Sequence, residues 1–141
     1  TADGLSYQLI NDDTEVAITG CDDDMTSVTV PSEIEGKPVT TIAERALSSK
    51  SKLLKVTLPD SVTTIESRAF NDCSHLRSVD MGNGVKTIGT FGFSGCNELT
   101  SITLSENLTE IGESAFNQCS ALTELALPDS VVTIGNGVFA S

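Results

Sequence analysis

Aromatic and basic residues are both scarce in this chain of 141 residues. It has no tryptophan, one tyrosine and five phenylalanines, so a core has to be built mainly from valine, isoleucine and leucine. Eight lysines and arginines face twenty aspartates and glutamates, which gives a formal net charge of −12. Nucleic acids and anionic membranes are themselves negative, so we expect neither as a partner.

Long apolar runs and catalytic side chains are also missing. No apolar run approaches the roughly 20 residues that span a bilayer, so we expect no membrane insertion. His75 is the only histidine, and it follows Cys73 by two positions, but it belongs to a polar loop whereas Cys73 belongs to an apolar column. No other plausible general base, glycine-rich phosphate loop or zinc motif occurs. We therefore expect no enzymatic activity, no cofactor and no metal centre.

What the sequence does have is a repeat of 23 residues. Phenylalanine and cysteine each return at this step, and further apolar columns run in the same register from 53 to 139 without a gap. The columns begin at Leu53, Val56, Leu58, Val62, Ile65, Phe70 and Cys73. A degenerate copy with a five-residue insertion precedes them and carries Lys50 at the cysteine position. The first repeat is thus atypical, as terminal repeats of arrays usually are.

Each repeat predicts one strand, one bend and one short helical segment. Ile102 and Leu104 are two residues apart and share one face of a strand. The following apolar positions are spaced by 3, 4, 1 and 3, which predicts a bend at Leu108–Ile111 and one or two helical turns at Glu113–Cys119. Glycine follows the isoleucine in three repeats and would permit a sharp turn (Gly89, Gly112 and Gly135).

One repeat cannot bury its own apolar side, so we expect the repeats to stack, with parallel strands about 4.8 Å apart. The predicted fold is a β-rich solenoid of one degenerate and four regular repeats over residues 25–141. Residues 1–24 predict a β-hairpin cap, with strands Leu5–Ile10 and Glu15–Thr19. Together they would form a single folded domain. The sequence ends inside a repeat, and we expect it to be part of a longer chain.

The pattern L-x-x-[VI]-x-[LM]-x-x-x-[VL]-x-x-I-x-x-x-[AG]-F-x-x-C is similar to a leucine-rich repeat. With the Pro-Asp-Ser turn and the "AF…C" ending, residues 25–141 resemble the BspA-like bacterial leucine-rich repeat family. The resemblance implies a leucine-rich-repeat solenoid of the α/β superhelix type and no enzymatic activity. Family members are mostly secreted or surface-attached and are described as adhesive or protein-binding. The resemblance thus implies an extracellular or cell-surface protein interaction module, with a carbohydrate-binding module of a polysaccharide-degrading system or a structural spacer as alternatives.

The outward strand positions are the candidate partner-contact surface. They form two polar rows, the first of Lys55, Ser78, Ser101 and Glu124 and the second of Thr57, Asp80 and Thr103. The rows offer no ring for a sugar to stack on, so a protein ligand fits better than a glycan, and a purely solvated face is the alternative. Phe91 is a further candidate, because the core does not require it, although it could equally cover neighbouring side chains. We expect the chain to be a monomer.

Cysteines and acidic runs have structural explanations as well as chemical ones. Cys73, Cys96 and Cys119 should point inward as reduced thiols, because three members of a column cannot all pair. Cys21 is expected in the loop after the hairpin, with its redox state open. The acidic runs Asn11–Glu15 and Cys21–Asp24 predict solvated turns, with calcium binding as the alternative.

Overall fold

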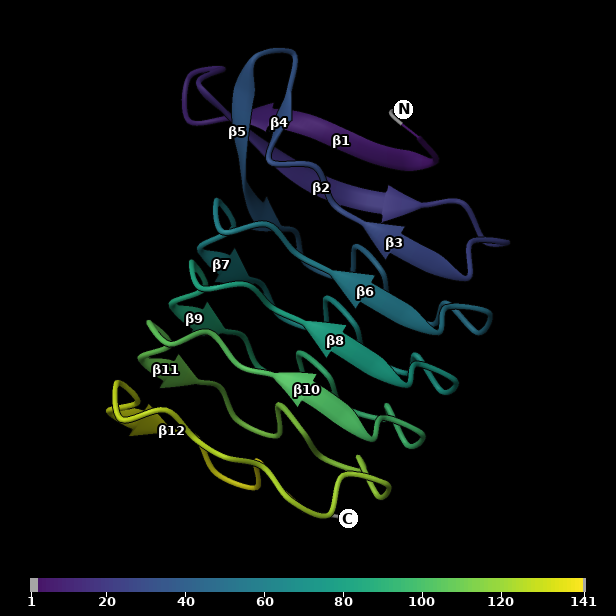
Figure 1. Ribbon diagram of the computed structural model, residues 1–141, viewed down its shortest axis with the longest axis vertical. Helices are drawn as coiled ribbons and strands as arrows, with labels where there is room; N and C mark the ends of the chain where they lie inside the picture. Colours follow the sequence, from purple (N-terminus) through teal and green to yellow (C-terminus); the bar gives the residue numbers. More distant parts are fainter. Residues whose placement is uncertain (1–2, 141) are drawn as a thin grey trace.

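The computed structural model describes residues 3–140. The chain winds as a solenoid whose turns stack along its longest axis, with the N-terminal strands at one end and the C-terminus at the other (Figure 1). The first three regular turns each carry two short strands, one in each of two sheets, and the last turn carries one, in the larger sheet. The prediction of one strand per repeat is therefore wrong, because the bend before the isoleucine also pairs with its copies as a strand.

The N-terminal hairpin is formed by β1 (Leu5–Ile10) and β2 (Glu15–Cys21). β2 then pairs in parallel with β5 (Lys37–Ile42), so the hairpin adds two strands to the N-terminal end of the larger sheet. Cys21 is the last residue of β2 and is buried, so its expected place in a loop is wrong. It pairs with Leu5 and packs in the core, because β2 extends two residues further than its apolar alternation indicates.

The degenerate repeat contains a second hairpin. After β3 (Ser27–Thr29), the inserted residues form β4 (Glu33–Ile34), which turns back antiparallel onto β5. The turn uses positive φ at Glu35 and Gly36, 56° and 76°. Tyr7 on β1 donates a hydrogen bond from its hydroxyl to Glu35 Oε2 at 2.8 Å, which links the two hairpins. This hydrogen bond raises the pKa of Tyr7.

Two parallel ladders run along the array. The first is a four-stranded sheet of β3, β6 (Lys55–Thr57), β8 (Ser78–Asp80) and β10 (Ser101–Thr103). The second continues from β5 through β7 (Thr64–Ile65), β9 (Thr87–Ile88), β11 (Glu110–Ile111) and β12 (Thr133–Ile134). Both keep the register of the repeat, so each strand residue lies beside its copy one repeat away.

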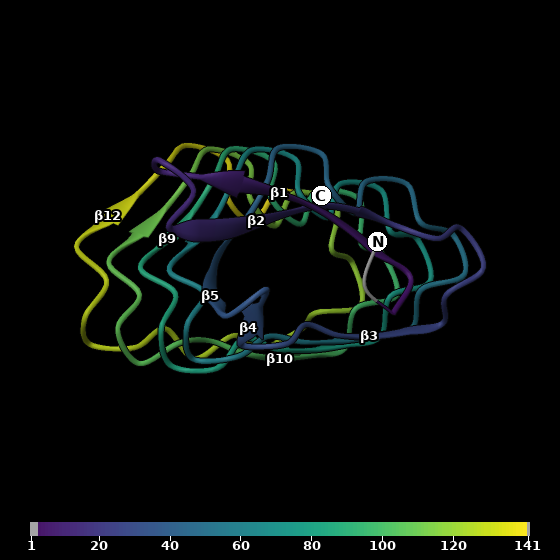
Figure 2. The same cartoon turned by 90° about the horizontal axis from the view of Figure 1, so that it is seen from above.

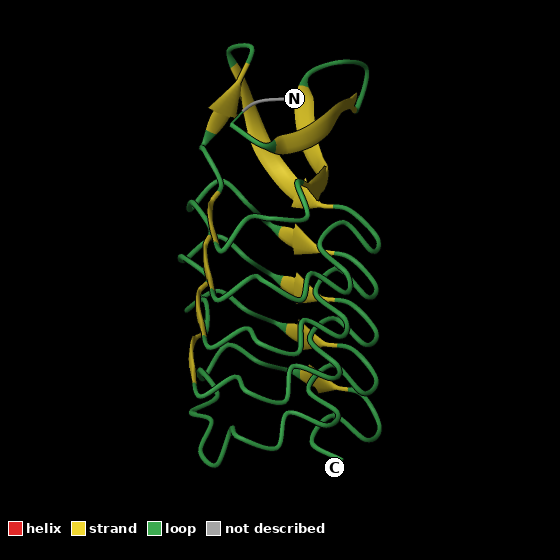
Figure 3. Ribbon diagram, turned by 90° about the vertical axis from the view of Figure 1, so that its right-hand side faces the viewer, coloured by secondary structure: helices red, strands yellow, loops and turns green. Residues whose placement is uncertain are grey.

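The described residues contain no helix, and hence none that could cross a membrane (Figure 3). The helical turns expected at Glu113–Cys119, and with them the α/β superhelix detail, are wrong. Ser114 and Gln118 adopt positive φ, and the backbone alternates between turn bonds inside the repeat and bonds to the next repeat. The N–H of Cys119 donates to Phe116, for example, whereas the N–H of Phe116 donates to Val138. A helix would keep both bonds within its own segment, so stacking of repeats replaces it here.

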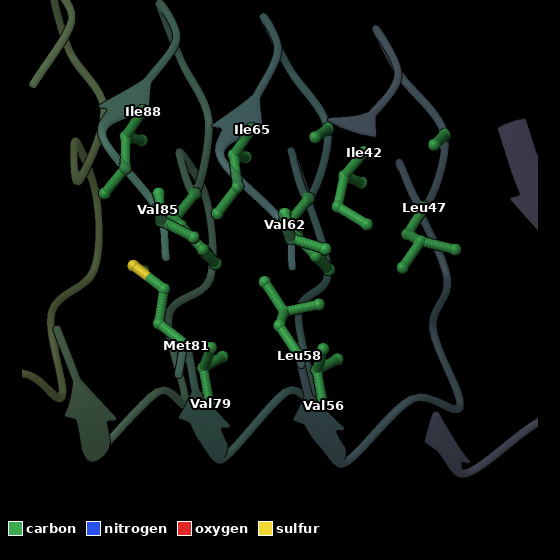
Figure 4. Close-up of a cluster of buried hydrophobic side chains, with 14 of the residues drawn as sticks. Ile42, Leu47, Val56, Leu58, Val62, Ile65, Val79, Met81, Val85 and Ile88 are labelled. Carbon is green, nitrogen blue, oxygen red and sulfur yellow. The ribbon is translucent and has the colours of Figure 1, made fainter. Parts of the chain in front are cut away.

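The core consists of the repeated apolar columns, and copies of one column lie side by side (Figure 4). Ile65, Ile88 and Ile111 are fully buried, and the rings of Phe70, Phe93 and Phe116 stack almost parallel, with centroids 4.9 and 5.4 Å apart. Burial declines in the last repeat, where Ile134 is 48% and Phe139 53% exposed. These two side chains have a neighbour on one side only, because no described residue stacks on the other.

Glycine after the isoleucine serves close packing rather than a sharp turn. Gly89 does not have a positive φ, and a Cβ placed on it would lie 2.6 Å from the backbone nitrogen of Ser67 in the preceding repeat. Gly112 is in the same position against Thr90. The expected turn role is therefore wrong, and glycine is needed because the backbones of adjacent repeats approach too closely for a side chain.

Candidate binding surface

The solvent face of the four-stranded sheet is defined here as the polar sheet face. In each strand the middle residue points into the core, and the two flanking residues point outward. The ladder aligns these flanking positions in two rows, Ser27, Lys55, Ser78 and Ser101 in one, and Thr29, Thr57, Asp80 and Thr103 in the other. Six of the predicted contact residues are thus brought together on one surface.

The polar sheet face is a regular and rigid display of short polar side chains. Parallel strands place neighbours in a row about 4.8 Å apart, so four strands span about 14 Å. Lys55 and Asp80 provide its two charges, and neither forms an ion pair within residues 3–140. Asp80 instead accepts a hydrogen bond from the backbone N–H of Gly82 at 3.1 Å. Both charges therefore remain free to meet a partner.

Glu124 does not belong to this surface. It is exposed, but the segment around it forms no strand, and β10 is the edge of the sheet. The side chains of Leu122, Leu125 and Phe139 border a cavity of about 260 Å³ here, where the last repeat packs less tightly. The register that places Ser101 beside Ser78 is thus not continued to Glu124.

Phe91 lies in the turn segment after β9 rather than on the polar sheet face. Its ring is half-buried, and the guanidinium of Arg68 in the preceding repeat lies 4.7 Å from the ring centroid. Both residues adopt a φ of 57°, so they are stacked copies of one turn position. The pair is a cation–π contact, in which the guanidinium of Arg68 covers one face of the Phe91 ring. Apart from Tyr7, Phe91 is the one aromatic residue of the sequence that does not belong to the phenylalanine column.

Sequence reasoning missed two parts of the surface. Ser27 and Thr29 extend both rows by one strand, and the triplet "SVT" of the degenerate repeat matches "SVD" and "SIT" closely enough to have found them. Leu54 precedes β6 and is 37% exposed, so it adds an apolar group beside Lys55. Its repeat equivalents are arginine and threonine, so the periodic pattern gave no signal for it.

A second concavity lies where the N-terminal hairpin joins the array. Its volume is about 290 Å³. It is lined mainly by polar side chains from four strands and the adjoining turns, among them Gln8, Asn11, Thr19, Thr41, Thr64 and Glu66. Glu66 also accepts a hydrogen bond from the backbone N–H of Glu44 at 3.1 Å, which occupies one of its carboxylate oxygens. The concavity contains no titratable pair that would suggest acid–base chemistry.

The cysteine column faces inward, as predicted, and all four cysteines are free and buried. Each column thiol donates to a backbone carbonyl of the preceding repeat, at 2.9 Å for Cys73, 3.2 Å for Cys96 and 3.1 Å for Cys119. Burial raises the pKa of Cys119 to about 11, and the neighbouring Cys73 thiol together with burial raises the pKa of Cys96 far above its usual range. Cys96 and Cys119 are therefore protonated, enclosed and poor nucleophiles. The hydrogen bond with Cys96 lowers the pKa of Cys73, but this thiol is fully buried, so burial assigns the whole column a structural role.

Lys50 replaces the thiol in the degenerate repeat by a longer donor. Its Nζ donates to the backbone oxygen of Cys21 at 2.9 Å and to Asp23 Oδ1 at 2.6 Å. The hydrogen bond with Asp23 raises the pKa of Lys50 and lowers that of Asp23. The ammonium thus bonds to a backbone carbonyl of the preceding segment, as each column thiol does, although its acceptor is the last residue of β2 and the thiols' acceptors lie in turns.

The other chemical candidates do not assemble into sites. His75 is exposed, with its Nδ1 3.3 Å from the hydroxyl of Ser74, whereas the thiol of Cys73 is directed to Leu47. Asn11, Asp12 and Asp13 form an exposed turn with positive φ. Within residues 3–140 no group of three or more histidine, cysteine, aspartate or glutamate side chains is arranged to hold a metal ion.

Comparison with known proteins agrees with this geometry. Residues 17–141 match the sequence model of the BspA type leucine rich repeat region, in six copies. The chain is 33% identical to a T. pallidum leucine rich repeat protein (TpLRR), covering 99% of this chain and 65% of that one, with a TM-score of 0.95. It is 32% identical to a leucine rich cell surface protein from Faecalibacterium prausnitzii, covering 99% of this chain and 39% of that one, with a TM-score of 0.85.

A leucine-rich repeat protein from Bacteroides ovatus is 29% identical, with a TM-score of 0.89 and coverage of 99% of this chain and 38% of that one. The chain therefore spans less than two thirds of each of these solved relatives. Among curated proteins, none matches the chain. The match over residues 17–141 and the stacked 23-residue turns place the chain in the BspA-type leucine-rich repeat family.

Proposed function

We propose that this chain is a non-enzymatic protein-binding module of an extracellular or cell-surface protein, and that it binds through the polar sheet face. Leucine-rich repeats of this family are generally protein interaction modules. One solved relative is described as a cell surface protein, which supports the same location for this chain. An adhesive role follows from this location if the partner is itself fixed to a surface.

The observation that carries the proposal is the contrast between the two sides of the four-stranded sheet. Its inner side repeats one apolar residue type per strand, Val56, Val79 and Ile102, whereas the outer side is a polar display of serine and threonine in which Lys55 and Asp80 are the only departures. Among residues 3–140 neither Lys55 nor Asp80 forms an ion pair, and the partly exposed Leu54 directly precedes Lys55 in the sequence. A ladder of hydrogen-bonded strands fixes these side chains in advance, so a partner loses little additional entropy on ordering them.

A glycan is less well supported as the ligand. The polar sheet face has no aromatic ring among its described residues, and sugar sites usually stack the sugar on one. Of the rings outside the buried core, Phe91 is engaged by Arg68 and Tyr7 by Glu35. Phe139 is 53% exposed, and it stacks on Phe116 at the end of the phenylalanine column. The spacer alternative predicts no ligand for any surface.

The test is a binding screen of the chain against purified extracellular-matrix proteins and, in parallel, against a glycan array. For a protein ligand, Asp80→Lys should weaken binding at least about tenfold, because it reverses a charge in the middle of the contact. Glu113→Lys is the matched control, since it makes the same change of charge on an exposed residue in the turn segment after β11. Equal effects of the two variants would exclude the polar sheet face as the site.

Other outcomes separate the alternatives. Glycan binding that is lost in Phe91→Ala or Tyr7→Ala would favour a carbohydrate-binding module. Absence of any ligand in both screens would favour the spacer.

A further inference from the structure

β1 is the terminal strand of the larger sheet, at the N-terminal end of the solenoid (Figure 2). Among the described strands β1 pairs with β2 alone, which lies on one side of it. On the other side, the backbone groups of Leu5–Ile10 have no backbone partner within residues 3–140 apart from the turn bond from Thr14 to Ile10. The strand therefore presents an open row of hydrogen-bonding groups.

This edge lacks the devices that usually protect an open strand. Its sequence, LSYQLI, contains no charged residue and no proline. The bulge of the hairpin lies on the opposite strand, where Thr19 has no counterpart between Ser6 and Tyr7, so β1 itself stays regular. The remaining free edges are shorter, three residues in β3 and β10 and two in β4 and β12. β1 is thus the longest regular edge in the described part of the chain, and such edges accept added strands.

The N-terminal segment that contains β1 carries charge of one sign, and the lysine that packs against it, Lys50 at the carbonyl of Cys21, is paired with Asp23. The first 36 residues hold nine aspartates and glutamates and no lysine or arginine, and all eight basic residues lie between Lys37 and Lys86. Asp12 and Asp13 are exposed in the turn at one end of β1, and Asp3 is exposed before the other end. A second copy paired antiparallel to β1 would bring these acidic ends together, which disfavours a dimer at this edge. A basic segment is attracted to both ends.

We propose that β1 is a docking edge that takes up an extended, lysine- or arginine-rich segment of a partner protein as an additional strand. Backbone hydrogen bonds along Leu5–Ile10 hold the segment, and Asp3, Asp12 and Asp13 select its positive charge. The site is separate from the polar sheet face, so a protein can be bound at one surface while the other is free.

The experiment uses a short synthetic peptide that alternates lysine with valine, and measures both its affinity and its effect on amide hydrogen exchange. We expect binding with increased protection of residues 5–10. The glutamate counterpart should not bind, and the lysine peptide with alternate backbone nitrogens methylated should bind at least about tenfold more weakly, because it cannot complete the hydrogen bonds.

Two sets of variants test the same edge from the protein side. Gln8→Lys places a cation on an exposed residue of β1 and should weaken the peptide about tenfold, whereas Thr103→Lys, the same change of charge on β10, should have no effect. The double variant Asp12→Asn with Asp13→Asn should weaken peptide binding about threefold to tenfold, because it removes two negative charges. It should leave the turn intact, because asparagine tolerates the φ of 58° and 63° found there.

Several results would overturn the proposal. One is that the lysine peptide fails to bind, and another is that its binding protects amides outside residues 5–10. A third is that the methylated peptide binds with equal affinity, which would show that charge attraction alone holds the peptide. A dimer that protects residues 5–10 without any peptide would show that a second copy occupies the edge. Asp80→Lys should leave the peptide bound, so this test fails or succeeds independently of the polar sheet face.

Discussion

Replacing Phe93 by alanine tests the stacked core most sharply. Its side chain is fully buried between two parallel rings, Phe70 at 4.9 Å and Phe116 at 5.4 Å. A buried phenylalanine removes at least about 150 Å² from water, worth about 4 kcal/mol at about 25 cal/mol per Å². Alanine retains part of this burial and the loss of ring contacts adds to the cost, so the free energy of unfolding should fall by about 3–5 kcal/mol.

Phe139 provides the matched control in the last repeat. It is 53% exposed and stacks on one ring only, Phe116, at 6.1 Å. Phe139→Ala should therefore cost about 1–2 kcal/mol. Urea unfolding followed by circular dichroism gives both values, and a reduced m-value in the Phe93 variant would show that the repeats on its two sides unfold separately. A loss below about 1 kcal/mol at Phe93, or equal losses at the two positions, would refute the stacked column.

Three further predictions concern the links between repeats. Burial raises the pKa of Cys119 to about 11 from its ordinary value of 9.0, so this thiol ionises less readily in the folded protein than in the unfolded one. Its contribution to stability should be intact below pH 9 and be lost as the pH rises to 11. In urea unfolding, the wild type should therefore lose about 2 kcal/mol more than Cys119→Ala over this range. Lys50→Ala should cost about 1–2 kcal/mol, since it leaves the Cys21 carbonyl without its donor, whereas removal of the exposed Asp23 carboxylate should change the melting temperature little. Gly89→Ala should lower the free energy of unfolding by about 1–3 kcal/mol, and an unchanged value would show that adjacent backbones can separate without cost.

The sequence predicts the core well because the repeat makes each column visible three or four times. Ile88, Phe93 and Cys96 are all buried where the 23-residue step places them. The hairpin strands follow from simple alternation, although the end of β2 at Cys21 does not, because Thr19 forms a bulge and interrupts the alternation. The 23-residue period also predicts the rows of the polar sheet face, because in parallel strands of a regular repeat each residue pairs with the residue 23 positions later.

The helical segment could not be judged from apolar spacing alone. The positions from Ile111 to Cys119 have the spacing of a helix, yet every second backbone N–H in this segment donates to the neighbouring repeat. Residues such as Ser114 and Gln118 accept positive φ there because stacking supplies the hydrogen bonds that a helix would otherwise provide. The 23-residue period predicts Glu124 on a strand beside Ser101, but the segment around Glu124 forms no strand and β10 is the edge of the sheet. The period gives the position of a residue in the repeat, but not whether the backbone there pairs with its neighbour.

The solenoid and its polar sheet face both require repeats that stack directly on one another, and methyl-selective NMR is the most direct test of this stacking. Adjacent parallel strands lie about 4.8 Å apart and next-nearest strands about 10 Å. We predict nuclear Overhauser effects between the methyl groups of Ile65 and Ile88 and between those of Ile88 and Ile111, with none between Ile65 and Ile111. Absence of the first two, or a contact between Ile65 and Ile111, would contradict the in-register stack and the binding surface built on it.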